Sequence, residues 1–243
     1  MVLTTIGTGS KGNCYLLSAD SSNLILDAGI SAKMAGSYVW KWSCIDGCLV
    51  THEHKDHAKY WADYARLGVP VYMTKGTYTK VQTAPEWTMH PVESKATFKT
   101  GKWTVMPFDV EHDAVNPVGY LIRYGPTGET VLYATDTYYL RYTFPGVNYW
   151  IVECNYCEDR LDGSEMSLQL RGRLLRSHMS LRRLKDTLAA NDLTQTRAIV
   201  LVHLSDERSD SERMIREISE IAGISEVYAA EADSRIILDK TPF

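Results

Sequence analysis

The sequence predicts an α/β protein folded as an αβ/βα sandwich, and three observations lead to this class. Apolar runs of strand character alternate with segments of helical spacing in both halves of the chain. Polar residues follow directly after several of these runs, and strand ends are where open sheets leave a cleft. The 243 residues contain no linker-like stretch. We therefore expect one domain over residues 1–243.

The bulk composition is that of an ordinary globular protein, with 44% hydrophobic and 23% charged residues. The net charge of −4 carries no global nucleic-acid signature, so any site for a polyanion must be local. Five cysteines, an odd number, fit a reducing compartment better than a disulfide framework. The first residues contain neither a basic leader nor a long apolar run, which predicts a cytoplasmic protein with no membrane segment.

The first two predicted strands, 2–6 and 14–19, flank a glycine-rich loop with the pattern G-x-G-x-x-G. A dinucleotide site would need a helix directly after this loop, but residues 14–19 have strand character and 20–23 read as a hairpin turn. The glycines are therefore expected to form a tight turn. Three polar residues of the loop are candidate phosphate contacts: Ser10, Lys11 and Asn13.

The next strand, 24–26, ends at Asp27, beside the turn residue Gly29. Two interpretations of Asp27 stay open: a local Asx-turn cap, or a carboxylate that orients a metal-binding histidine ring. Ser31 is expected to begin a helix that continues through Trp42.

The most informative stretch is Thr51–His57, where three of the seven histidines and an aspartate fall within six positions. It follows a buried strand, 47–50, and precedes a helical pattern that continues to Gly68. His52 and His54, two residues apart, can point the same way while Asp56 and His57 approach from the start of the helix. One turn of this kind can serve two adjacent metal ions.

Further candidate ligands stand at the ends of later strands. We predict a strand over 69–73, a helix or turn with a loop over 76–95, strands over 97–100 and 102–110, a hairpin of 118–124 and 130–134, and a strand over 149–152. His112, Asp136 and Glu153 follow three of these strands. An ionised carboxylate offers two oxygens, so Asp136 can bridge two cations.

The remaining chain is predicted to contain helices over 158–176, 181–190 and 211–222, and strands over 198–202, 226–230 and 235–238. His203 follows the strand 198–202. His178 lies within a basic run that contains no acidic residue: Arg171, Arg173, Arg176, Arg182, Arg183 and Lys185. Such a run can be a solvated helix face or a phosphate-binding surface, and we expect Arg176 to contact substrate.

The pattern H-x-H-x-D-H at 52–57, followed by His112, Asp136 and His203, resembles the metallo-β-lactamase-fold hydrolases. By position, the resemblance implies that His52, His54 and His112 hold one divalent metal ion, zinc or manganese. It implies that Asp56, His57 and His203 hold a second such ion and that Asp136 lies between the two.

Within that family the chain resembles the WalJ/YycJ-like subfamily, which includes DNA exonucleases related to the tRNA 3′-processing enzymes and to phage cyclic-nucleotide phosphodiesterases. The resemblance is carried by residues 9–14, 26–29, 112–119, 153–155 and 178–180. The chain departs from the subfamily at Tyr156 and Cys157, where His-Asp is expected, and at Ser177, where glycine is expected. These departures bear on substrate choice more than on metal binding.

The resemblance implies a phosphodiesterase mechanism in which Asp56 orients the nucleophile and His178, kept protonated by Glu153, protonates the leaving oxygen. The expected substrate is nucleic acid, with a 5′-to-3′, single-strand-preferring DNA exonuclease as the leading function. Three alternatives stay open: a cyclic-nucleotide phosphodiesterase that degrades immune signals, a thioester or lactone hydrolase, and a binding module without catalysis. A homodimer is also expected from the relatives.

Overall fold

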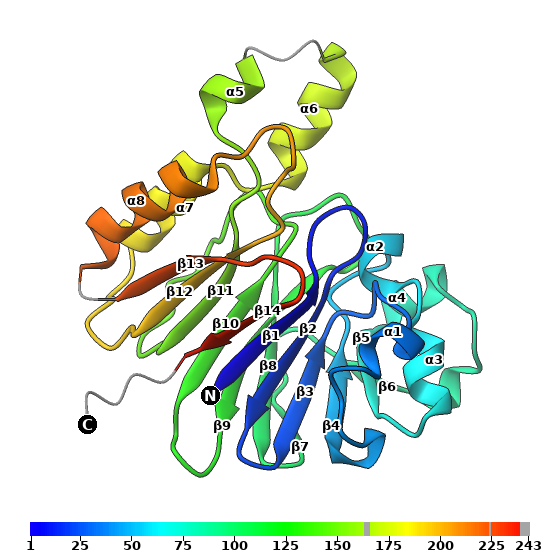
Figure 1. Cartoon of the computed structure of the whole chain (residues 1–243). Helices are drawn as coiled ribbons and strands as arrows, with labels where there is room; N and C mark the ends of the chain where they lie inside the picture. The colour runs from blue at the N-terminus through cyan, green and yellow to red at the C-terminus, as the bar shows by residue number, and fades with distance from the viewer. Residues whose placement is uncertain (163–165, 224, 239–243) are drawn as a thin grey trace. The chain divides into compact units, whose positions relative to one another are not determined.

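The computed structural model describes residues 1–162, 166–223 and 225–238, and the chain divides into two compact units (Figure 1). The first unit comprises Met1–Asp109, Ala114–Glu129 and the C-terminal segment from Glu231. The second comprises Val110–Asp113 and Thr130–Ala230. Each unit is therefore assembled from stretches that are separated in the sequence.

The first unit contains a seven-stranded sheet in the order β14-β1-β2-β3-β4-β5-β6. Its strands are β1 (Val2–Gly7), β2 (Cys14–Ala19), β3 (Ser22–Leu26), β4 (Ile45–Leu49), β5 (Val71–Thr74), β6 (Met89–Val92) and β14 (Ser234–Ile237). Strands β1, β2, β3 and β14 pair antiparallel, whereas β3 to β6 pair parallel. The antiparallel pairing of β1 with β2 confirms that the glycine-rich loop joins two strands and opens no helix.

Short helices lie beside the parallel strands of this sheet (Figure 1). They are α1 (Ala32–Ala35), α2 (Lys55–Ala58), α3 (Trp61–Arg66) and α4 (Lys75–Lys80), with 3₁₀ turns at Trp42–Cys44 and Glu86–Thr88. Trp61 and Tyr64 of α3 are fully buried in one cluster with Cys48 and Val71 of the strands. This packing fixes the segment that follows β4.

The helix expected over 31–42 was wrong in extent, because α1 ends at Ala35. Its start is confirmed, since the Ser31 side chain accepts a hydrogen bond from the Met34 amide as an N-cap. Gly36 and the following run of Ser, Tyr, Val and Trp have low helix propensity, so the amphipathic pattern there does not extend the helix.

The first unit also contains a three-stranded antiparallel arrangement of β7 (Phe98–Thr100), β8 (Trp103–Asp109) and β9 (Val118–Tyr124). Trp103, Val105, Tyr120 and Ile122 alternate with more exposed positions along β8 and β9 and are buried. This period of two is the pattern of a sheet with one face against a core. The strands predicted over 97–100, 102–110 and 118–124 are confirmed.

The second unit is built on four parallel strands, β10 (Thr130–Ala134), β11 (Tyr149–Glu153), β12 (Ala198–Val202) and β13 (Glu226–Ala229). Every residue of β11 and β12 is buried, as expected for a parallel sheet covered on both faces. Its helices are α5 (Glu158–Asp162), α6 (Leu168–Ser177), α7 (Leu181–Ala189) and α8 (Ser211–Ala222). Figure 1 shows α7 and α8 lying along the sheet.

The single helix predicted over 158–176 was wrong, because the described residues form two helices, α5 and α6, separated at Met166 and Ser167; positions 163–165 lie outside the described residues. The predicted helices 181–190 and 211–222 are confirmed as α7 and α8. The alternation of strands and helices in both units confirms the α/β class. No helix in the described part of the chain is both long and apolar enough to cross a membrane.

Candidate functional site

The turn after β4 gathers three imidazoles within the first unit. His54 is the N-cap residue of α2, and His52 and His57 flank it with their side chains buried. The ring centroid of His52 lies 4.7 Å from that of His54 and 4.3 Å from that of His57. Asp56 Oδ2 lies 3.5 Å from His57 Nε2. The predicted strand-to-helix turn therefore brings all four side chains together.

Asp27 orients two of these rings from the end of β3. Its carboxylate accepts hydrogen bonds from the Thr51 amide at 2.8 Å, from Thr51 Oγ1 at 2.9 Å and from His57 Nδ1 at 2.8 Å. Thr51 Oγ1 is also 3.0 Å from His52 Nδ1. Because Thr51 donates its proton to Asp27, His52 Nδ1 donates to Thr51. Both rings thus carry their proton on Nδ1 and present Nε2 as the ligand atom.

The glycine-rich loop packs against the turn that carries His52, His54 and His57. Asn13 is fully buried; its amide donates to the Asp56 carbonyl, and its side chain bonds Gly9 and lies 3.0 Å from His57 Nε2. Gly29 must lack a side chain, because a Cβ there would collide with the Asp56 carbonyl. Ser10 and Lys11 lie exposed at the tip of the loop. The structure thus gives Asn13 a contact with the histidine turn and leaves Ser10 and Lys11 facing solvent.

In the second unit, three candidate residues lie at the carboxyl edge of the parallel sheet. Glu153 is the last residue of β11 and pairs with Val202, directly before His203 on β12. Asp136 follows β10, the other neighbour of β11. Parallel strands end at one edge, so these side chains meet there. Asp136 Oδ1 lies 3.1 Å from His203 Nδ1.

His112 and His178 complete this cluster. His112 Nδ1 donates to the Ser177 carbonyl at 2.9 Å, which leaves its Nε2 directed at Asp136 Oδ2, 3.6 Å away. Asp136, Glu153, His178 and His203 each offer one ligand atom, and these atoms all lie within 4.8 Å of one another. This group has the donor types that divalent cations bind, and within it the hydrogen bond between His178 and Glu153 engages these two side chains with each other.

Glu153 accepts four hydrogen bonds although it is fully buried. Its Oε1 accepts from His178 Nδ1 at 2.7 Å and from His203 Nδ1 at 2.8 Å, and its Oε2 accepts from the amides of Thr137 at 3.0 Å and Met179 at 3.1 Å. Burial raises the pKa of Glu153, but the charge of His178 and the hydrogen bonds from His178 and His203 outweigh it, so the pKa is lowered.

The pKa of His178 is shifted in the opposite direction by the same pairing with Glu153. Its burial lowers the pKa, while the charge of Glu153 and the hydrogen bond to it raise the pKa by more, so the net pKa is raised. The imidazole is therefore stabilised in its protonated form. The pairing of Glu153 with His178 expected from the sequence is present at 2.7 Å.

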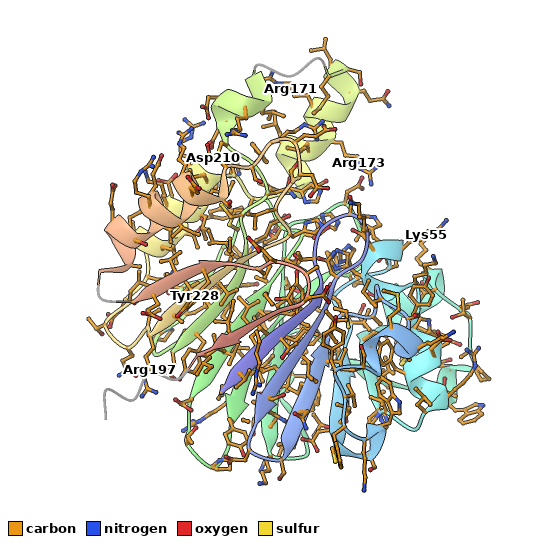
Figure 2. The ribbon with its side chains drawn as sticks, in the orientation of Figure 1. Lys55, Arg171, Arg173, Arg197, Asp210 and Tyr228 are labelled. Carbon is orange, nitrogen blue, oxygen red and sulfur yellow. The ribbon has the colours of Figure 1, made fainter. Side chains whose placement is uncertain are left out.

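The basic run divides into two parts at His178. On α7, Arg182 lies 3.5 Å from Glu158, the Arg183 guanidinium lies 4.9 Å from the Tyr138 ring centroid, and Lys185 donates to Glu217 at 2.8 Å. On α6, Arg176 is exposed and Arg173 is 60% exposed, with Asp113 3.8 Å away (Figure 2). Exposed cations therefore stand on both helices: Arg173 and Arg176 on α6, and Arg182, 76% exposed, on α7.

Two positioning residues had no separate signal in the sequence. Thr51 connects Asp27 with His52, and Asn155 donates from Nδ2 to the His203 carbonyl at 2.7 Å. Thr51 begins the histidine stretch, and Asn155 belongs to the segment that carried the family resemblance, so position was the available clue. Their hydrogen bonds depend on tertiary contacts that local patterns do not reveal.

Comparison with known proteins places the chain among metal-dependent hydrolases. A 26% identical relative over 251 residues is the exodeoxyribonuclease WalJ of Streptococcus pneumoniae, matched over 96% of this chain and 90% of that protein. The exodeoxyribonuclease YycJ of Bacillus anthracis is 26% identical over 240 residues, 90% of this chain and 88% of that protein. These matches confirm the predicted resemblance.

Solved structures share the fold. The metallo-β-lactamase-fold protein YhfI of Bacillus subtilis matches with a TM-score of 0.76 at 18% identity, over 97% of this chain and 98% of that one. The short form of human tRNase Z matches with a TM-score of 0.68 at 14% identity, over 99% and 100%. These likenesses confirm the predicted αβ/βα sandwich.

The family model described as the beta-lactamase superfamily domain matches residues 22–204. That span begins with β3 and ends just after His203, so it contains Asp27, the histidine turn and the cluster of the second unit. Because this match extends over most of the sequence, the chain belongs to the β-lactamase superfamily.

Proposed function

We propose that the chain is a metal-dependent phosphodiesterase that acts on nucleic acid, and specifically a 5′-to-3′ exonuclease that prefers single-stranded DNA. The observation that carries the proposal is the Glu153 carboxylate, which holds His178 at 2.7 Å and His203 at 2.8 Å. It joins a candidate proton donor to a candidate metal ligand. The relatives named exodeoxyribonucleases support the same chemistry.

The donor set fits a divalent metal. His52, His112 and His203 each engage Nδ1 with an oxygen acceptor, so Nε2 is the ring atom that would coordinate. His57 engages Nδ1 with Asp27, and a metal at its Nε2 would replace the contact with the Asn13 side chain at 3.0 Å. We propose that His52, His54 and His112 hold one ion, that Asp56, His57 and His203 hold a second, and that Asp136 is shared. Two divalent ions, zinc or manganese, would supply a water of lowered pKa and offset charge on the phosphoryl oxygens.

The side chains would divide the proton transfers between them. Asp56 is half-buried at the start of α2 and would accept a hydrogen bond from the attacking water, orienting it toward phosphorus. His178 keeps Nδ1 on Glu153, so its Nε2–H is the proton available to the departing alkoxide. The bond from water oxygen to phosphorus forms as the ester bond breaks, and this proton neutralises the leaving oxygen.

Substrate contacts are proposed on exposed basic and polar positions. Ser10 and Lys11 at the tip of the glycine-rich loop and Arg176 on α6 are exposed, and they would contact phosphate groups. Asn13 would act through His57, which its side chain contacts. We further propose that the protein works in the cytoplasm and forms a homodimer; native mass spectrometry tests the dimer directly.

Replacing His178 tests the proposed proton donor. We expect His178→Ala to lower turnover of 5′-phosphorylated single-stranded DNA by about 100-fold or more, the effect of losing a general acid. Metal content, measured by mass spectrometry of the metals, should stay at the wild-type value. His90→Ala is the matched control, because His90 is the one histidine of the seven outside both clusters.

The same assay separates the rival functions. Wild type with zinc and with manganese would be given the DNA, a panel of cyclic nucleotides and a thioester side by side. Release of mononucleotides from DNA, lost in Asp56→Ala, supports the proposal. Hydrolysis of cyclic nucleotides or of the thioester with the DNA left intact overturns it.

A further inference from the structure

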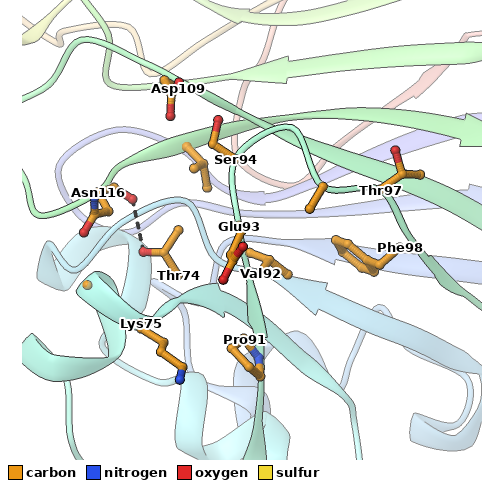
Figure 3. A pocket seen from close by; sticks show the side chains of 13 residues that line it. Thr74, Lys75, Pro91, Val92, Glu93, Ser94, Thr97, Phe98, Asp109 and Asn116 are labelled. Carbon is orange, nitrogen blue, oxygen red and sulfur yellow. Dashed lines mark hydrogen bonds between the residues drawn. The ribbon is translucent and has the colours of Figure 1, made fainter.

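A cavity of about 590 Å³ opens within the first unit, and the proposed chemistry does not use it (Figure 3). Its walls come from the β5–α4 junction, β6, the segment leading into β7, and positions 109, 116 and 118. Small-molecule sites typically measure roughly 300–1,000 Å³. The cavity is therefore large enough for one flat heterocycle with its sugar.

One wall of the cavity is tied to the histidine turn. The Val118 amide donates to the Thr51 carbonyl at 3.0 Å, and the Val115 amide donates to Glu53 Oε1 at 2.8 Å. Thr74 Oγ1, on the facing side, donates to the Asn116 carbonyl at 3.1 Å (Figure 3). A ligand in the cavity would thus be held by the same loop that contacts the turn carrying His52 and His54.

The geometry of this wall is fixed by a glycine. A Cβ on Gly76, the second residue of α4, would collide with Asn116 Oδ1 and approach the Val115 carbonyl. Asn116 adopts a left-handed backbone conformation, with φ of 55°. The loop therefore packs directly on the start of α4, and the Asn116 side chain belongs to a preformed lining.

The lining is suited to a nucleobase. Two carboxylates, Glu93 and Asp109, and one ammonium, Lys75, line the cavity. Lys95 Nζ lies 3.9 Å from Asp109 Oδ2 and offsets its charge, so Glu93 is the principal acceptor of the lining. Phe98, Val92 and Pro91 supply apolar surface, and the Phe98 ring stacks on Tyr72 with centroids 4.5 Å apart. Flat apolar walls beside carboxylates and an amide match a heterocycle that carries amino groups.

We propose that this cavity binds the nucleobase next to the cleaved phosphate and prefers adenine, cytosine and guanine, whose exocyclic amino groups can donate to Glu93 and Asp109. The inference rests on the proposed function for the identity of the ligand. It adds a site for the base to a mechanism that otherwise recognises only phosphate, and it predicts dependence on base identity at the end of the strand.

Nucleosides without phosphate are the direct probe, because their binding requires neither metal nor cleavage. 2′-Deoxyadenosine, 2′-deoxycytidine, 2′-deoxyguanosine and thymidine would be titrated into the full chain and followed by NMR. We expect the three amino-bearing nucleosides to bind at least about tenfold more tightly than thymidine, a difference of about 1.4 kcal/mol. Wild type that binds none of them, or binds thymidine equally well, overturns the proposal.

Two variants localise the binding. Ala96→Trp places an indole into the cavity from an exposed lining position and should abolish nucleoside binding, whereas the matched Ala189→Trp on the exposed end of α7 should not. Glu93→Gln keeps the shape and should reduce the preference over thymidine. Nucleoside binding that survives in Ala96→Trp, with the variant folded by circular dichroism, contradicts the site.

A kinetic comparison separates this inference from the proposed function. For 5′-phosphorylated oligonucleotides with a normal or an abasic terminal nucleotide, Ala96→Trp should reduce the ratio of kcat/KM values by at least tenfold. DNA cleavage with an unchanged ratio refutes the cavity alone. Nucleoside binding by a protein that cleaves no DNA refutes the proposed function alone.

Discussion

At the scale of single residues, the candidate ligands are set by hydrogen bonds on the far side of each imidazole. Thr51, Asp27, the Ser177 carbonyl and Glu153 each accept a hydrogen bond from an Nδ1–H group, so the ring orientation is set before any metal binds. Three of these rings are buried, and desolvation strengthens the contacts.

Asp27→Asn tests whether the hydrogen bond to Nδ1 orients the His57 ring for metal binding. The amide keeps the shape but no longer offers a charged acceptor to His57 Nδ1, and such partners typically account for about 10- to 100-fold in metal affinity. We expect a loss of that size, measured by competition with a chromogenic chelator. Asp63→Asn, on the exposed face of α3, should match wild type. Unchanged metal affinity in Asp27→Asn would show that Asp27 serves only the local turn.

The sequence indicated His52, Asp136 and His203 because each stands just after an apolar strand, and strand ends collect at sheet edges. Their roles as metal ligands stay predictions. It could not choose between the two interpretations of Asp27, since the choice depends on Thr51 and His57 approaching from another strand. Nor could it divide the basic run, because Glu158, Tyr138 and Glu217 are distant in sequence from the cations that they contact.

At the scale of elements, α7 and α8 are joined through Glu217. Its carboxylate accepts from Arg213 Nε at 2.7 Å and from Lys185 Nζ at 2.8 Å, and these hydrogen bonds lower the pKa of Glu217 to about 2. The pKa in the folded state lies below the ordinary glutamate value of 4.5. The resulting stabilisation is therefore complete above that value and is lost as the pH falls towards about 2.

Glu217→Gln should reduce the free energy of unfolding at pH 7 by up to about 1 kcal/mol, the usual range for partly exposed ion pairs. The difference from wild type should shrink as the pH is lowered from 4.5 towards 3. Urea unfolding at pH 7, 4.5 and 3 measures it, with the exposed Glu220→Gln as the control on the same helix. A difference that stays constant with pH would contradict the assignment.

The helices show where pattern and propensity disagree. The bounds predicted for α8 from its amphipathic spacing match the observed helix, because Asp210 caps its first turn and Gly223 ends its last turn. The pattern over 31–42 continued past Gly36, where the backbone leaves the helix. The hydrophobic pattern alone predicts which face of a helix is buried. The residue at which the helix ends depends on capping and packing.

At the scale of the whole molecule, metal binding and folding should be linked. A ligand that binds only the folded chain adds about 2.7 kcal/mol at a free concentration of about 100 times its Kd. We expect zinc or manganese to raise the Tm of wild type and a chelator to lower it, with little response in His52→Ala or His203→Ala. His90→Ala should respond like wild type, and a metal-independent Tm would count against the proposed centre.

The same thermal scan tests the prediction of one domain over residues 1–243. A single transition with equal calorimetric and van't Hoff enthalpies supports it, whereas two separate transitions would show that the compact units unfold independently.

The pairing of β1 with β14 has a consequence for biosynthesis. Val2 lies opposite Ile237, so β1 acquires its outer neighbour only after every other described strand has been made. Until then β1 is an edge, with unpaired backbone groups beside the buried Leu3. Until β14 has been made, nascent chains would therefore expose an aggregation-prone edge strand. We expect the protein to depend on holdase chaperones during its synthesis.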